Sequence, residues 1–207
     1  EELITTALPL IGNLCLSSRE HVQKLIDMGL VHKLMELRKM PQYSPDAYWC
    51  LSNVTEAAPD LFSKLAVNET NVSKLVDSVL IDTKSDQNQV RKEATFFLAS
   101  LILYISRNFQ NAFIKQGVFQ ALVSVLDITN NKDVIVVLHI FDVFIRLFSY
   151  VEQHLDKYDH FMELINETHL TEKVERIAES EEPMLVTKAH EIQKQFKELQ
   201  EHHAASK

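Results

Sequence analysis

The chain has 207 residues, of which 46% are hydrophobic, and this is enough to bury a substantial core in one or two domains. Its three glycines and five prolines are too few for an all-β protein, which needs turn residues at short, regular intervals. The formal charge of −8 disfavours nucleic acids and anionic membrane surfaces as partners and favours basic ones.

The sequence offers neither a disulfide framework nor a recognisable targeting segment. Its two cysteines, Cys15 and Cys50, are expected to be small core residues, and no signal peptide opens the chain. The longest apolar run, 134–148, contains a histidine, an aspartate and an arginine, and we expect it to be too short to span a bilayer. These features predict a soluble intracellular protein.

The predicted elements are all helices, and several of their starts carry a recognisable signal. Ser44 is expected to be an N-cap, followed by Pro45 in the first turn and Asp46 near the positive end of the helix dipole. Thr171 and the residues before Pro183 are interpreted in the same way. Helices are predicted at 1–16, 20–28, 30–39, 45–57, 59–67, 71–81, 87–105, 108–115, 119–126, 133–150, 152–166, 171–179 and 182–201.

Two glycines indicate a repeat. Gly29 and Gly117 each follow an amphipathic run and directly precede apolar residues, which predicts a left-handed cap between two helices. They lie 88 residues apart, or two units of 44. Between them, Asn68 or Asn71 is expected to provide the same cap, because asparagine tolerates the left-handed region.

A second series of residues supports this period. Asn13, Asn53 and Ser100 each lie about four residues into a long apolar helix, 40 and 47 residues apart, and Asp46 and Glu93 precede the last two by seven residues. Repeats of this length with two or three helices are typical of armadillo and HEAT solenoids. We therefore predict an all-α fold, a right-handed superhelical armadillo solenoid with about four complete three-helix repeats and one leading helix. It would form a single domain over 1–207, with the end of a truncated repeat at 1–16, repeats at 17–58, 59–105, 106–150 and 151–201, and a tail at 202–207.

Trp49, the only tryptophan, lies one helical turn before Asn53, so the two side chains share a helix face. The third helices of such a solenoid line its concave, ligand-binding face. A tryptophan ring can contact the cationic end of Lys or Arg, and a carboxamide can bond the backbone of an extended peptide. Asp46 and Glu93 would add a negative field. The residues alone leave two interpretations open, a Trp49 ring exposed on the ligand-binding face and a Trp49 ring buried between repeats.

The order of these landmarks resembles the C-terminal half of importin α. The resemblance rests on Trp49-x-x-x-Asn53, on the Gly-Asn helix at 10–15, on the Ile-Asp-x-Gly junction at 26–29, and on the helices that follow. These helices are at 91–100, 132–142, 171–177 and 188–196. The resemblance implies an adaptor without enzymatic activity that binds nuclear localisation signals on its concave face. The implied peptide-binding residues are Asn13, Asp46, Trp49, Asn53, Glu93, Phe96 and Ser100.

The resemblance also implies partners and a location. These are cargo proteins with Lys/Arg-rich signals, importin β through an N-terminal segment missing from this chain, and a recycling exportin with its small GTPase at the last repeats. Such an adaptor shuttles between cytoplasm and nucleus. The family's earlier repeats, principal signal site and autoinhibitory segment have no counterpart here, so we expect a fragment of a longer protein.

Departures from the family pattern favour an alternative. Phe96 and Ser100 replace the family's second Trp-Asn pair, and Pro9 stands four residues before Asn13, where the family has a long basic residue. The alternative is an armadillo or HEAT scaffold that holds a different protein partner.

The sequence suggests no catalytic or metal site. It contains no glycine-rich phosphate loop and no serine or cysteine in a nucleophile context. His154 and His160 lie six residues apart, which is the wrong spacing for one helix face, and His202 and His203 belong to the tail. We expect no enzyme activity, no metal and no cofactor.

Overall fold

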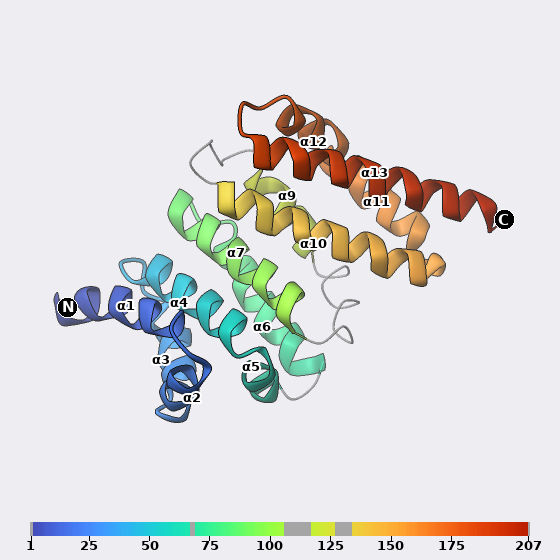
Figure 1. Cartoon of the computed structure of the whole chain (residues 1–207). Helices are drawn as coiled ribbons and strands as arrows, with labels where there is room; N and C mark the ends of the chain where they lie inside the picture. Colours follow the sequence, from blue (N-terminus) through green and yellow to red (C-terminus); the bar gives the residue numbers. More distant parts are fainter. Residues whose placement is uncertain (1, 67–68, 106–116, 127–133, 207) are drawn as a thin grey trace. The chain divides into compact units, whose positions relative to one another are not determined.

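The computed structural model describes residues 2–66, 69–105, 117–126 and 134–206. All regular elements in these ranges are helices, so the all-α prediction is confirmed (Figure 1). The chain divides into two compact units, Glu1–Gln116 (unit 1) and Gly117–Lys207 (unit 2). The single-domain organisation stays a prediction, and the helix expected at 108–115 lies outside the described residues.

Unit 1 has the three-helix repeat that the sequence predicts. Helix α4 packs between α1 and α7, while α3 packs on α4 and α6 packs on α7 (Figure 1). The leading helix and the third helices of two repeats therefore stand side by side. The helices of unit 1 are α1 (Glu2–Cys15), α2 (Arg19–Asp27), α3 (Leu30–Leu37), α4 (Ser44–Ala57), α5 (Pro59–Ala66), α6 (Glu69–Asp82) and α7 (Asn88–Tyr104).

The predicted left-handed conformation is confirmed at both glycines, and Gly29 has it between two helices. Gly29 has φ 86° and ψ 19° and Gly117 has φ 77° and ψ 13°, each directly before a new helix, a conformation that costs glycine little. Asn71 lies inside α6, so the prediction that it caps a helix is wrong. Asn68 lies outside the described residues.

The start of α4 differs from the prediction. The Ser44 N–H donates to the Met40 carbonyl oxygen over 2.9 Å, so the chain is already helical there and Tyr43 takes the N-cap position. Ser44 is therefore the first residue of α4 and not its N-cap, and its buried hydroxyl bonds no backbone N–H of the first turn. Pro45 and Asp46 lie in the first turn as predicted.

An ion pair between the buried Arg38 and the partly exposed Asp82 joins the two repeats of unit 1. Arg38 Nη1 donates to Asp82 Oδ2 and to the Tyr48 hydroxyl, each over 2.8 Å, and Nη2 donates to Ser78 Oγ over 2.9 Å. The Tyr48 hydroxyl in turn donates to Asp82. Burial raises the pKa of Tyr48, which keeps the phenol protonated. Arg38 directly follows α3, and Asp82 is the last residue of α6. The pair thus links the second helices of two successive repeats, and through Tyr48 it also holds α4.

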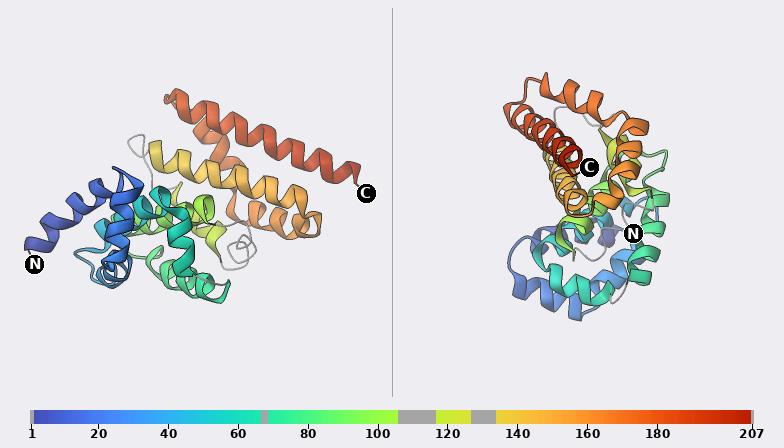
Figure 2. Two further views of the ribbon diagram at one scale, coloured as in Figure 1. Left: turned by 60° about the horizontal axis from the view of Figure 1, so that its bottom comes forward. Right: turned by 90° about the vertical axis from the view of Figure 1, so that its right-hand side faces the viewer.

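Unit 2 is built on two long helices. Helices α10 and α13 run side by side, α12 packs on α13, and α11 packs on α9 (Figures 1 and 2). Its elements are α9 (Val118–Val125), α10 (Val134–Gln153), the 3-10 turn η2 (Leu155–Lys157), α11 (Tyr158–Thr168), α12 (Leu170–Ala178) and α13 (Pro183–Ala205).

Two boundaries in unit 2 were predicted wrongly. The helix expected at 152–166 begins only at Tyr158, because α10 continues to Gln153 and His154 leaves the helical conformation with φ −137° and ψ 67°. The helix expected to start at Thr171 begins at Leu170, after His169 in the left-handed region with φ 53°. His169 thus takes the place that glycine takes at the earlier junctions.

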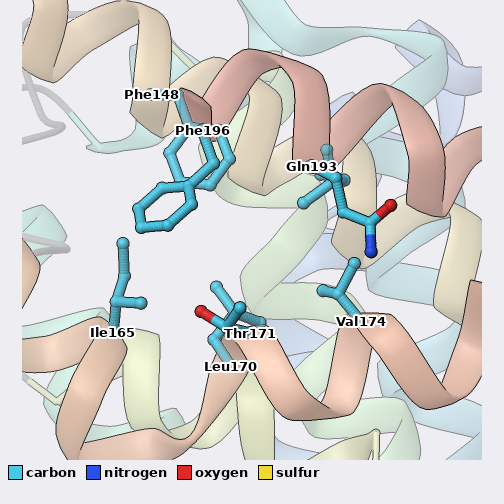
Figure 3. Close-up of a pocket in the computed structure, with 8 residues that line it drawn as sticks. Phe148, Ile165, Leu170, Thr171, Val174, Gln193 and Phe196 are labelled. Carbon is cyan, nitrogen blue, oxygen red and sulfur yellow. The ribbon is translucent and has the colours of Figure 1, made fainter. Parts of the chain in front are cut away.

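Aromatic rings fill the core of unit 2. The Phe119 ring lies 5.3 Å from Phe144 and 5.4 Å from Phe161, and Phe148 lies 5.7 Å from Phe161 and 5.9 Å from Phe196, all between ring centroids. A pocket of about 20 Å³ remains where α10, α11, α12 and α13 meet (Figure 3). This volume is enough for about one water molecule and no larger ligand.

Among the described residues, α10 alone is long and apolar enough to cross a membrane by length and composition. The expectation that this run is too short is wrong, since the helix continues five residues beyond Phe148 to Gln153. Phe141, Phe144 and Phe148 on this helix are buried within the protein, as they are in a core helix.

Candidate functional site

The structure brings the seven predicted binding residues onto three adjacent helices of unit 1. Since α4 packs between α1 and α7, a single extended ligand could reach all three helices. The residues are Asn13 on α1, Asp46, Trp49 and Asn53 on α4, and Glu93, Phe96 and Ser100 on α7.

Trp49 is held against the backbone of α1. A Cβ atom built on Gly12 would lie 2.1 Å from Cζ3 of Trp49 and 2.6 and 2.7 Å from two neighbouring ring carbons. The ring therefore occupies the space that any other residue at position 12 would need. Trp49 remains half-buried, so part of the indole is accessible while α1 fixes its position.

Asn53 and Cys50 complete the docking of α4 on α1. Asn53 Nδ2 donates to the Gly12 carbonyl oxygen over 3.2 Å, and Cys50 Sγ donates to the Leu8 carbonyl oxygen over 3.3 Å. Asn53 is only 6% exposed. One amide donor of Asn53 is thus used within the protein, and the side chain as a whole is almost completely covered.

Helix α7 presents a weaker version of the same surface. The Phe96 ring is half-buried, whereas Phe97 is fully buried and lies 5.8 Å from Tyr48, between ring centroids. Ser100 is buried, and its hydroxyl donates to the Phe96 carbonyl oxygen over 3.1 Å. Glu93 accepts from Gln89 Nε2 over 2.9 Å. Helix α7 therefore offers one ring and one carboxylate, and the hydroxyl at position 100 bonds its own helix.

Both thiols are buried, and burial changes their acidity. Burial raises the pKa of Cys15 to about 11 and that of Cys50 to about 12, so both remain protonated near neutral pH. Within the ranges that the structure describes, no group of three His, Cys, Asp or Glu side chains could hold a metal ion.

Sequence reasoning missed two features that position this site. The first is Gly12, whose signal was a glycine inside a helix, where glycine costs about 1 kcal/mol relative to alanine and often marks a close approach. The second is the partly buried pair of Arg38 and Asp82, whose signal was a separation of 44 residues, the length of one repeat.

Comparison with family models and with curated proteins finds no match. Among solved structures, a designed armadillo repeat protein in complex with the peptide (KR)4 aligns with a TM-score of 0.66 at 18% identity, over 95% of this chain and 76% of its own. Computationally designed armadillo repeat proteins for modular peptide recognition align with a TM-score of 0.66 at 15% identity, over 99% and 83%. An engineered protein aligns with a TM-score of 0.65 at 17% identity, over 93% of this chain and 74% of its own. At these identities the likeness is one of fold, and the chain has an armadillo-repeat fold.

Proposed function

We propose that this protein is a binding scaffold that takes up Lys/Arg-rich peptide segments across α1, α4 and α7, with Trp49 as the central contact. The observation that carries the proposal is the Trp49 ring, fixed over Gly12 and still partly accessible beside Asn53. A ring that is already positioned loses little conformational freedom when a ligand binds.

The chemistry of the surface fits a basic ligand. A Lys or Arg side chain over the Trp49 face gains about 0.5–2 kcal/mol, depending on exposure. Asp46 on α4 and Glu93 on α7 are half-buried carboxylates that favour cationic side chains. Because α7 offers Phe96 in place of a second tryptophan, binding is weak and centred on α4. It weakens with added salt.

The wider role that we propose is that of a nuclear import adaptor of the importin α type. The sequence resemblance supports this role, and the designed armadillo protein in complex with (KR)4 supports the capacity of the fold to hold a Lys/Arg peptide. In this role the partners are nuclear localisation signals, importin β and a recycling exportin with its small GTPase. The protein acts by binding, without catalysis, and moves between cytoplasm and nucleus.

A second candidate is an armadillo scaffold for a protein partner that is not basic. The observation that favours it is the burial of both polar side chains on which a peptide backbone would depend. Asn53 donates to Gly12 and Ser100 donates to its own helix, so neither is fully free to bond a ligand.

Fluorescence anisotropy of labelled (KR)4 tests the proposal. We expect Trp49→Ala to weaken binding about 2- to 30-fold, the range that corresponds to the loss of a cation–π contact, and Trp49→Phe to weaken it less. Met28→Ala is the control, since Met28 is 84% exposed at the α2–α3 junction. Equal affinity of Trp49→Ala and Met28→Ala for (KR)4 would favour the second candidate.

A further inference from the structure

Negative charge is concentrated in unit 2. Residues 117–207 contain 16 Asp and Glu against nine Lys and Arg, a formal charge of −7, whereas residues 1–116 contain 13 against 12, a formal charge of −1. The candidate site on α1, α4 and α7 therefore lies in the nearly neutral part of the chain. Unit 2 therefore offers a second, negatively charged surface to which a strongly basic partner can bind.

The parallel helices α10 and α13 form an open apolar notch near their N-terminal ends. Leu138 and Met184 line it together with Asp142 and Lys188. Met184 is 60% exposed, and Ile135, one turn before Leu138, is 74% exposed. Large apolar side chains at this exposure are a surface that a partner's apolar side chain can cover.

Farther along the same two helices lies a polar pocket of about 170 Å³. Ser149 and Glu152 line it from α10, and Gln195 and Glu198 line it from α13, above the buried Leu199. Four polar side chains, two of them carboxylates, thus converge on one space. Such a lining suits the head of a Lys or Arg side chain, which carries only donors.

The notch and the pocket lie on the same side of the line along which α10 and α13 pack together, which we call the α10–α13 seam. The residues that line them recur at intervals of three, four, seven or eleven, which keeps them within one stripe of each helix. On α10 the stripe is Leu138, Asp142, Ser149 and Glu152, and on α13 it is Met184, Lys188, Glu191, Gln195 and Glu198.

The charges along this stripe do not cancel. Lys188 bonds both Asp142 over 2.8 Å and Glu191 over 2.9 Å, so one cation faces two carboxylates. Glu152 and Glu198 pair with exposed side chains. His202 lies 3.6 Å from Glu152 and is charged only when protonated, and Lys194, 76% exposed, lies 3.6 Å from Glu198. The surface between α10 and α13 is therefore a groove with a net negative charge and an apolar end.

We propose that the α10–α13 seam is a second docking surface, for an extended segment that carries an apolar side chain and, farther along, Lys or Arg. Charge complementarity selects this occupant over an acidic or purely apolar one. The apolar side chain covers Leu138 and Met184, and the cation enters the pocket between Glu152 and Glu198. Ten residues separate Asp142 from Glu152, which is about 15 Å along a helix and about four to five residues of extended peptide.

The test is a titration of protein labelled with ¹³C at the methionine methyl groups, using a Lys/Arg-rich peptide with one leucine four residues before its first arginine. The chain has five methionines, and Met184 alone lies in the seam. We expect the Met184 signal to shift with saturation and the exposed Met28 and Met40 to stay unchanged.

Charge-matched variants make the test specific. Glu152→Gln with Glu198→Gln should weaken the Met184 response about five- to tenfold, in line with the loss of two partly exposed charge contacts. Glu167→Gln with Glu175→Gln, exposed on α11 and α12, removes the same charge away from the seam and should leave the response unchanged. Equal weakening by the two pairs would overturn the proposal, because it would mean that only net charge matters.

The outcome is independent of the site in unit 1, since Trp49 emission reports that site and Met184 reports the seam. A Met184 shift that persists in Trp49→Ala supports the second surface even if Trp49 emission never changes. A change in Trp49 emission without any Met184 shift overturns the second surface and leaves the site on α4 in place.

Discussion

The Gly12→Ala substitution probes the geometry that fixes Trp49. The new methyl group would lie 2.1 Å from Cζ3 of the ring, whereas carbon atoms pack at about 3.5 Å, so the ring must move by about 1.4 Å or more. Forcing an extra methyl group into a packed contact costs about 1–3 kcal/mol. Replacing glycine by alanine inside a helix returns about 1 kcal/mol. We expect a net destabilisation of about 0–2 kcal/mol together with a displaced ring.

Two measurements follow this displacement. Because Trp49 is the only tryptophan, its emission maximum should shift in Gly12→Ala without any ligand, and affinity for (KR)4 should fall about 2- to 30-fold. Gly29→Ala is the matched control, since its added Cβ would meet nothing within 4 Å. It should cost about 1–2 kcal/mol through its left-handed backbone and leave Trp49 emission unchanged. Unchanged emission and affinity in Gly12→Ala would refute the contact and the role assigned to it.

Three further predictions concern the interactions that hold the repeats. Arg38→Ala should destabilise the protein by about 3 kcal/mol in urea denaturation, because it leaves Asp82 and a buried hydroxyl without their cation, whereas Arg19→Ala, in an exposed pair with Asp60, should cost much less. The Arg19 guanidinium lowers the pKa of Asp60 to about 2, so NMR titration should show it ionised down to that range. The stability that this pair gives the folded state should be complete above about pH 4 and be lost as the pH falls toward 2. Arg19→Ala should bring the pKa of Asp60 back toward about 3.9. Phe161→Ala should cost about 3–5 kcal/mol, since the ring is fully buried against two others.

The repeat and most helices could be predicted from the sequence because their signals are local. Gly29 and Gly117 mark left-handed junctions that other residues adopt at a cost, and Pro45 and Pro183 mark first turns. His169 adopts the same left-handed conformation without being glycine, so the junction before α12 carried no comparable signal.

The site was predicted less completely because its geometry depends on contacts between repeats. The spacing of Trp49 and Asn53 placed them on one helix face, and the structure has them on α4 beside α1. No local pattern indicates that the Asn53 amide bonds the Gly12 carbonyl, since that bond joins residues 41 positions apart. The same holds for the pair of Arg38 and Asp82.

The most direct test of the central claim is a titration of the protein with unlabelled (KR)4, followed by Trp49 emission at low and at high salt. The peptide contains no tryptophan, so any tryptophan signal comes from α4. We predict a saturable change in emission at low salt that weakens as salt is added. No change in Trp49 emission at low salt, at peptide concentrations where binding is detected by anisotropy, would contradict the claim that Trp49 is the centre of a Lys/Arg peptide site.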